Sequence, residues 1–138
     1  MARDRFHQVV RTALERDGWE ITHDPFRIKV GGVDMEIDLG AERLLAAERG
    51  EEKIAVEVKS FLVGTSAISE FHTALEQFIN YRVALRQKEP QRLLYLAVPN
   101  LVYNSFFQLD FPASILQENA VRTVVYDIEL AQIIQWKT

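Results

Sequence analysis

Apolar residues recur every three or four positions in two stretches of the chain, which is the spacing of amphipathic helices. The first helix ends near Gly18. The second begins at a cap, Ser66 or Ser69, and runs to about residue 88. The apolar stripe of the first helix consists of Phe6, Val9, Val10, Ala13 and Leu14. That of the second consists of Ile68, Phe71, Leu75 and Phe78.

Alternation of apolar and polar residues predicts most of the strands. These are residues 19–23, 26–30 and 33–39, a β-hairpin of residues 44–48 and 54–59 with its turn at 49–52, and two closing strands at 121–126 and 132–136. The uninterrupted apolar run at 93–98 is typical of a central strand covered on both faces. Short helices are expected at 100–107 and 113–118, separated by Asp110-Phe111-Pro112. This order predicts an α/β fold with a mixed β-sheet flanked by helices.

The expected hairpin also predicts which side chains share a face. Pairing across its turn sets Leu44 opposite Glu57 and Glu42 opposite Lys59. Even-numbered residues of the 33–39 strand then point to the same side as Glu57, provided that the chain passes Gly40 without a bulge.

Length and composition set the broad class of the protein. With 138 residues, 48% hydrophobic and 26% charged, residues 1–138 are expected to form a single globular domain. No apolar run is long enough to span a membrane, no signal peptide is evident, and there is no cysteine. These features favour a cytoplasmic protein. The net charge of −4 argues against a domain that grips DNA by bulk electrostatics alone.

The tripeptide Glu57-Val58-Lys59 places an acid and a base on the polar face of one predicted strand. Such a carboxylate can bind a divalent metal ion, while the ammonium group faces a phosphate or an attacking water. A solvated strand face with an ordinary ion pair is the alternative. Glu51-Glu52-Lys53 fits the same short pattern, so the tripeptide alone is not specific.

Two further groups of polar residues could converge on this pair. Asp34, Glu36 and Asp38 make the polar face of the 33–39 strand wholly acidic, which costs stability unless the face is solvent-exposed or binds a cation. Gln77 and Tyr81 lie one turn apart on the flank of the long helix, beside its apolar stripe. They are either ordinary boundary residues or side chains that reach into a site on the sheet.

An acid at Asp38, then Glu57-x-Lys59, then Gln77-x-x-x-Tyr81 resembles the restriction-endonuclease-like superfamily, in particular its exonuclease-type and resolvase-like branches. The resemblance implies a restriction-endonuclease-like mixed β-sheet flanked by helices. The stretches 31–34 and 37–39 also resemble the entry to the site in some branches, which makes Asp34 a rival to Asp38 as the first acid.

Nearly the whole chain is similar to the XisH family, known from cyanobacteria as controlling factors for excision of the fdxN DNA element. The matching stretches are residues 2–7, 18–25, 31–35, 37–42, 55–61, 70–75, 77–82 and 95–99. The resemblance implies a role alongside a site-specific recombinase and a second small protein of the XisI type. It does not imply that nuclease activity has been demonstrated. It also leaves open whether the protein forms a homo-oligomer.

Together these resemblances imply a metal-dependent endonuclease chemistry on DNA. Asp38, Glu57 and the Val58 carbonyl would bind Mg²⁺ or Mn²⁺. Lys59 would position the attacking water and stabilise developing negative charge, and Gln77 and Tyr81 would orient the lysine or the substrate phosphate. The alternative function is a non-catalytic accessory protein that keeps a nuclease-like fold and acts through an XisI-type or recombinase partner.

Overall fold

A computed structural model describes residues 2–44, 51–61 and 66–138. Its helices are α1 (Ala2–Arg16), α2 (Ala67–Lys88), α3 (Asn100–Tyr103) and α4 (Asp110–Glu118), with a 3₁₀ turn η1 at Phe106–Gln108. Its strands are β1 (Glu20–His23), β2 (Phe26–Val30), β3 (Val33–Ile37), β4 (Leu39–Leu44), β5 (Glu51–Val58), β6 (Leu93–Pro99), β7 (Thr123–Asp127) and β8 (Gln132–Lys137). No described helix is long and apolar enough to cross a membrane.

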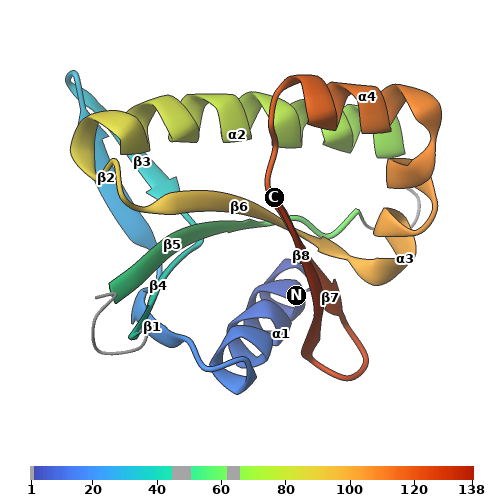
Figure 1. Cartoon of the computed structure of the whole chain (residues 1–138), viewed down its shortest axis with the longest axis horizontal. Helices are drawn as coiled ribbons and strands as arrows, with labels where there is room; N and C mark the ends of the chain where they lie inside the picture. Colours follow the sequence, from blue (N-terminus) through green and yellow to red (C-terminus); the bar gives the residue numbers. More distant parts are fainter. Residues whose placement is uncertain (1, 45–50, 62–65) are drawn as a thin grey trace.

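Six strands form one mixed sheet in the order β1-β4-β5-β6-β7-β8, and β2 and β3 form a separate hairpin. The central pairs β5–β6 and β6–β7 are parallel, and the outer pairs are antiparallel. Helices α2 and α4 cover one face of the six-stranded sheet, and α1 covers the other (Figure 1). The expected α/β fold with a mixed sheet flanked by helices is confirmed.

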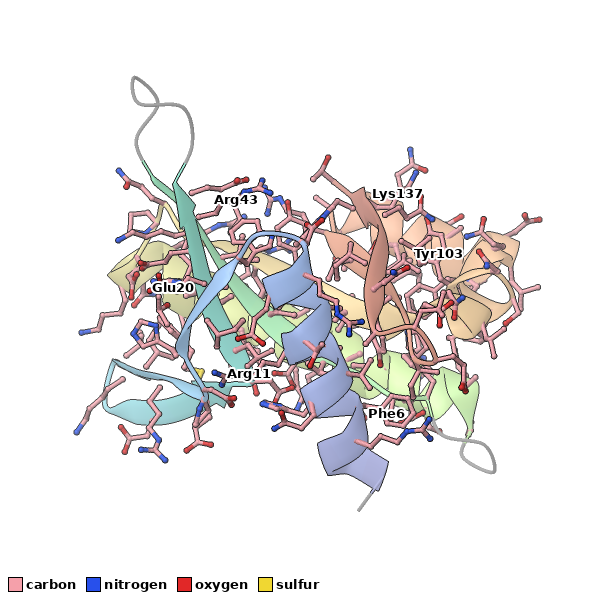
Figure 2. The ribbon with its side chains drawn as sticks, turned by 90° about the horizontal axis from the view of Figure 1, so that it is seen from below. Phe6, Arg11, Glu20, Arg43, Tyr103 and Lys137 are labelled. Atoms are coloured by element: carbon pink, nitrogen blue, oxygen red, sulfur yellow. The ribbon has the colours of Figure 1, made fainter. Side chains whose placement is uncertain are left out.

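Each face of the sheet carries its own apolar core. Between the sheet and α1, the buried side chains Val10 and Leu14 pack with Trp19, whose ring lies 5.7 Å from that of Trp136. Figure 2 shows α1 crossing this face, with Phe6 near its N-terminal end and Arg11 on the flank that faces the β2–β3 hairpin. The predicted first helix and its apolar stripe are confirmed.

The second core lies between the sheet and α2. Ser66, one of the two residues predicted as the cap, is the N-cap of this helix. Phe71 and Phe78 are buried, and Leu75 packs against them. Including Ile68 in the stripe was wrong: it lies in the first turn of α2, before the first residue that packs in the core, and is 38% exposed.

The predicted 33–39 strand is wrong in its extent, because the chain leaves one sheet for the other at Asp38. β3 ends at Ile37 in the hairpin, and β4 begins at Leu39 in the six-stranded sheet. Apolar and polar residues continue to alternate through this joint, so the pattern carries no sign of the break.

The predicted register of the next hairpin is also wrong. β4 pairs with β5 so that Glu42 lies opposite Lys53 and Leu44 opposite Glu51, instead of opposite Lys59 and Glu57. Glu51 and Glu52, expected in the turn, belong to β5, and the remainder of the expected turn and the 45–48 stretch fall outside the described residues. The observed register still sets even-numbered residues of β4 opposite odd-numbered residues of β5, and this ladder passes Gly40 without a bulge. The β1–β4 ladder does shift register there, between Ile21 and His23.

Most of the remaining elements follow the pattern. The apolar run becomes β6, a central strand buried on both faces, and the closing strands become β7 and β8. Asp110-Phe111-Pro112, expected as a separator, forms the first turn of α4 instead. Proline fits there because an N–H in the first helical turn has no partner within the helix.

The β2–β3 hairpin is held beside the sheet by a close approach at Gly40. A Cβ atom at this position would lie 2.8 Å from Cδ2 of Phe26 and 3.1 Å from Cβ of His23. Phe26 is buried against the α2 core, so its ring has little room to retreat. Only glycine allows β4 and the start of the hairpin to pack this closely.

We therefore expect Gly40→Ala to lower the free energy of unfolding by about 1–3 kcal/mol, because the added methyl overpacks the Phe26 contact. Urea denaturation measures the loss. In a Phe26→Ala background the same substitution should cost less, since the ring is gone. Equal losses in both backgrounds would contradict the assigned contact.

Candidate functional site

The acidic pair of the site is built where the chain passes from β3 into β4. Continuing the β4–β5 register by one position sets Asp38 opposite Glu57. The backbone N–H of Asp38 donates to Oε1 of Glu57 at 3.3 Å, and the backbone N–H of Val58 donates to Oδ2 of Asp38 at 2.8 Å. Each acid thus accepts a hydrogen bond from the backbone of the other segment, which holds the two carboxyl groups side by side.

Lys59 completes the centre from the end of β5. Its Nζ lies 3.5 Å from Oε2 of Glu57 and donates a hydrogen bond to Oε1 of Gln77 on α2. Gln77 therefore reaches from the helix flank into the site, as its position on the flank suggests. The side chains of Asp38, Glu57, Lys59 and Gln77 come from three separate segments of the chain.

Tyr81 lies one turn beyond Gln77 on the same flank of α2. The pKa of the Tyr81 phenol is raised mainly by burial, and the negative charges of Glu57 and Asp38 raise it further. Tyr81 is therefore within electrostatic range of the two acids. The five side chains predicted for the site thus belong to one neighbourhood.

The rival acid, Asp34, lies elsewhere. It is an exposed residue of β3, paired with Lys29 across the hairpin. Glu36, on the same strand, forms an ion pair with Arg27 at 3.0 Å. Of the three acids between positions 34 and 38, Asp38 is the one that exchanges hydrogen bonds with Glu57 and Val58.

Tyr126 and Ala97 are contributors that the sequence did not suggest. The Tyr126 hydroxyl donates to the Lys59 carbonyl oxygen at 2.9 Å, and the Lys59 N–H donates to the Ala97 carbonyl at 2.9 Å. The backbone of Lys59 is therefore fixed from both β6 and β7. The available signal was a tyrosine that follows Val124 and Val125 in a predicted strand, since a buried phenol needs a hydrogen-bond partner.

The centre brings two acidic side chains, Asp38 and Glu57, together with one lysine, Lys59. Glu57 is only 4% exposed, and burial, followed by the nearby negative charge of Asp38, raises its pKa to about 7, although Lys59 acts in the opposite direction. Two carboxylates face one ammonium group, so added positive charge would favour the ionised form of Glu57. No group of three or more His, Asp or Glu side chains suited to a metal ion occurs within the described ranges.

A groove of about 530 Å³ runs alongside the centre, between the β2–β3 hairpin and α2. It is lined by Val30, Val33, Met35, Gln77, Asn80, Tyr81, Val83 and Ala84. Because Gln77 and Tyr81 belong to both the groove and the centre, a molecule lying in the groove would reach the acidic pair and Lys59.

Burial of Glu57 predicts a pH dependence of stability. Its pKa is about 7 in the folded chain against an ordinary value of 4.5, so the folded state binds the proton more tightly. The resulting stabilisation is complete below pH 4.5 and is lost as the pH rises through 7. Relative to Glu57→Gln, the wild type should lose on the order of 3 kcal/mol across this interval in urea denaturation.

Glu36→Gln is the matched control for this measurement, because Glu36 is an exposed carboxylate near the site. Both variants remove one carboxylate, so a pH dependence that is lost in Glu57→Gln and kept in Glu36→Gln belongs to Glu57. Parallel curves for Glu57→Gln and the wild type would show that Glu57 titrates like a solvated side chain.

Comparison with known proteins identifies the family. A search of curated proteins gives no match. The structure resembles that of an XisH family protein from Nostoc punctiforme PCC 73102, with 59% identity, 97% of this chain and 99% of that chain covered, and a TM-score of 0.89. It also resembles an fdxN element excision controlling factor protein from Anabaena variabilis, with 60% identity, coverage of 98% and 99%, and a TM-score of 0.90. Residues 1–134 match the family described as XisH protein, and the chain therefore belongs to the XisH family.

Proposed function

We propose that this chain takes part in excision of a DNA element and that it is a metal-dependent nuclease-type protein. The observation that carries the proposal is the convergence of Asp38, Glu57, Lys59 and Gln77 on one partly enclosed centre. The Anabaena variabilis relative, described as an fdxN element excision controlling factor, supports DNA as the substrate.

The arrangement also supports a place in the restriction-endonuclease-like superfamily. An acid at a strand joint, a Glu-x-Lys tripeptide at the end of a central strand and a glutamine on the next helix follow one another along the chain. This is the order of the motif that the sequence resembles, and the mixed sheet between helices is the setting in which that motif occurs.

The residues present suit a divalent cation. Mg²⁺ is usually bound through one or two carboxylates and keeps several of its waters, so a pair of acids is enough. Asp38 and Glu57, with the Val58 carbonyl, would hold Mg²⁺ or Mn²⁺. The raised pKa of Glu57 fits this reading, because a cation would relieve the repulsion from Asp38. A bound cation would supply an acidified water and offset charge on the scissile phosphate.

The protein's own side chains would do the remaining work. In hydrolysis, a water oxygen forms a bond to phosphorus, one phosphodiester P–O bond breaks, and the departing oxygen takes up a proton. The Lys59 ammonium would hold the attacking water and stabilise negative charge on the phosphate oxygens. Gln77 would keep the ammonium group in place, and Tyr81 would orient the substrate phosphate from the adjoining groove.

A non-catalytic accessory protein is the second candidate, and one observation favours it. Within the described residues the centre has two acids and no third, and one of them, Glu57, is already paired with Lys59. Such a protein would keep the nuclease-like fold and act through an XisI-type protein or a site-specific recombinase.

A metal site can be tested without a DNA substrate. Saturating Mn²⁺ should stabilise the wild type by about 2.7 kcal/mol at one hundred times the dissociation constant, since the folded state alone binds the ion. Asp38→Asn should lose most of this response, whereas Glu36→Gln should keep it. Thermal unfolding with and without Mn²⁺ measures both, and equal shifts in wild type and Asp38→Asn would exclude the site.

Catalysis is tested separately, by incubating the protein with supercoiled, linear and branched DNA in the presence of Mn²⁺. Lys59→Ala should reduce cleavage by about 10²–10³-fold, the effect of removing one charge-stabilising group. Lys29→Ala, on the exposed face of the hairpin, should cleave as the wild type does. A wild type that binds Mn²⁺ but cuts no DNA would favour the accessory role.

A further inference from the structure

Four arginines gather at a pocket on the other flank of α2. Arg82 and Arg86 lie on the last turns of that helix, Arg92 immediately precedes β6, and Arg122 immediately precedes β7. The pocket they line has a volume of about 140 Å³. It opens at the beginning of β6, whereas Lys59 follows the end of the parallel neighbour β5, so the two sites are separate.

Structural roles account for two of the four arginines. Arg92 is only 4% exposed, and its guanidinium donates to Glu89 at 3.0 Å and to Glu42 at 3.2 Å. Arg82 donates to the carbonyl oxygens of Asn119 and Ala120 at 2.6 and 3.2 Å, at the C-terminal end of α4. There it satisfies carbonyl groups that have no partner within the helix.

Arg86 and Arg122 have no such explanation. Neither pairs with a carboxylate in the ranges that the structure covers. Burial lowers the pKa of Arg82, and the like charges of Arg86 and Arg122 lower it further, so both of these cations repel Arg82. The negative, C-terminal end of the α2 dipole stabilises the charge of Arg86. Arg122 precedes a strand and receives no such stabilisation from a helix. An acidic chain of net charge −4 thus keeps an unbalanced positive pocket.

We propose that this pocket binds a phosphate group of the DNA backbone and so anchors the substrate away from the catalytic centre. The proposal rests on the proposed function for its choice of DNA. The guanidinium groups of Arg86 and Arg122 have unused donors, and their planar fork matches the oxygens of a phosphate. The surface that the pocket exposes is more polar than apolar, so we expect it to contact the DNA backbone and to position DNA without reading its sequence.

The position of the anchor on α2 sets its reach. Arg86 is about 13 Å along the helix from Gln77 at 1.5 Å per residue, and it points from the opposite flank. A strand that reaches both places therefore extends several nucleotides beyond the scissile bond, at 3.4 Å per step. The chain as a whole is acidic, with a net charge of −4, so the arginine pocket would provide local positive charge for binding the DNA backbone.

DNA binding in EDTA tests the anchor independently of cleavage. The double variant Arg86→Gln/Arg122→Gln should bind a duplex about tenfold more weakly, because charge-assisted hydrogen bonds to one phosphate are lost. The slope of log affinity against log salt concentration should fall by about 1. Arg5→Gln/Arg27→Gln removes the same charge from exposed positions of α1 and β2 and should change neither value.

A second arm uses inorganic phosphate at constant ionic strength. Phosphate should raise the melting temperature of the wild type and of the control variant, but not of Arg86→Gln/Arg122→Gln, which should itself melt no lower than the wild type. Stabilisation by phosphate with unchanged DNA affinity in the double variant would overturn the DNA anchor in favour of a free-phosphate site. Equal affinities and slopes in all three proteins, or a wild type that binds no DNA, would also overturn it.

The nuclease proposal and the anchor fail in different ways. Because Lys59→Ala leaves the arginine pocket intact, adding Arg86→Gln/Arg122→Gln to that variant should weaken its DNA binding as it weakens that of the wild type. Loss of cleavage in that variant with retained binding supports both proposals. Binding that weakens in Lys59→Ala but not in Arg86→Gln/Arg122→Gln would assign the backbone contact to the catalytic centre and overturn the anchor.

Discussion

The exchange of hydrogen bonds between Asp38 and the end of β5 is the constraint on which the rest of the site depends. Asp38 is both the joint at which the chain leaves the hairpin for the six-stranded sheet and one of the two acids of the centre. Its backbone N–H and its carboxylate are both used, so the turn in the chain and the spacing of the acids are fixed together. Any movement of the hairpin that breaks these bonds also separates the charges.

The centre is held by the sheet on one side and borders a groove on the other. Lys59 is tied through its backbone to Ala97 and Tyr126 in the middle of the sheet, where every neighbouring strand is paired. Gln77 and Tyr81 instead border an open groove whose other wall is a two-stranded hairpin. The charged groups are thus fixed on the side of the sheet, and the groove lies on the side of the hairpin.

Local patterns predicted the elements, but not how they meet. The shared face of Asp38 and Glu57 was predicted correctly despite a wrong register, because the true pairing is displaced by an even number of residues and parity is unchanged. The break at Asp38 was missed since alternation runs through it. Tyr126 and the arginine pocket were missed because their residues, far apart in the sequence, meet only through the parallel order of β5, β6 and β7.

The bond from Tyr126 to Lys59 joins residues 67 positions apart, across two crossover connections. During synthesis, the acids and the lysine emerge from the ribosome long before β7 does. Parallel pairing of this kind forms slowly, since the chain must close long loops first. A ribosome-bound fragment ending before β7 therefore has Asp38, Glu57 and Lys59 without the Tyr126 hydrogen bond that helps to fix the Lys59 backbone. The backbone of Lys59 is therefore fixed from both sides only once β7 has been made and has joined the sheet.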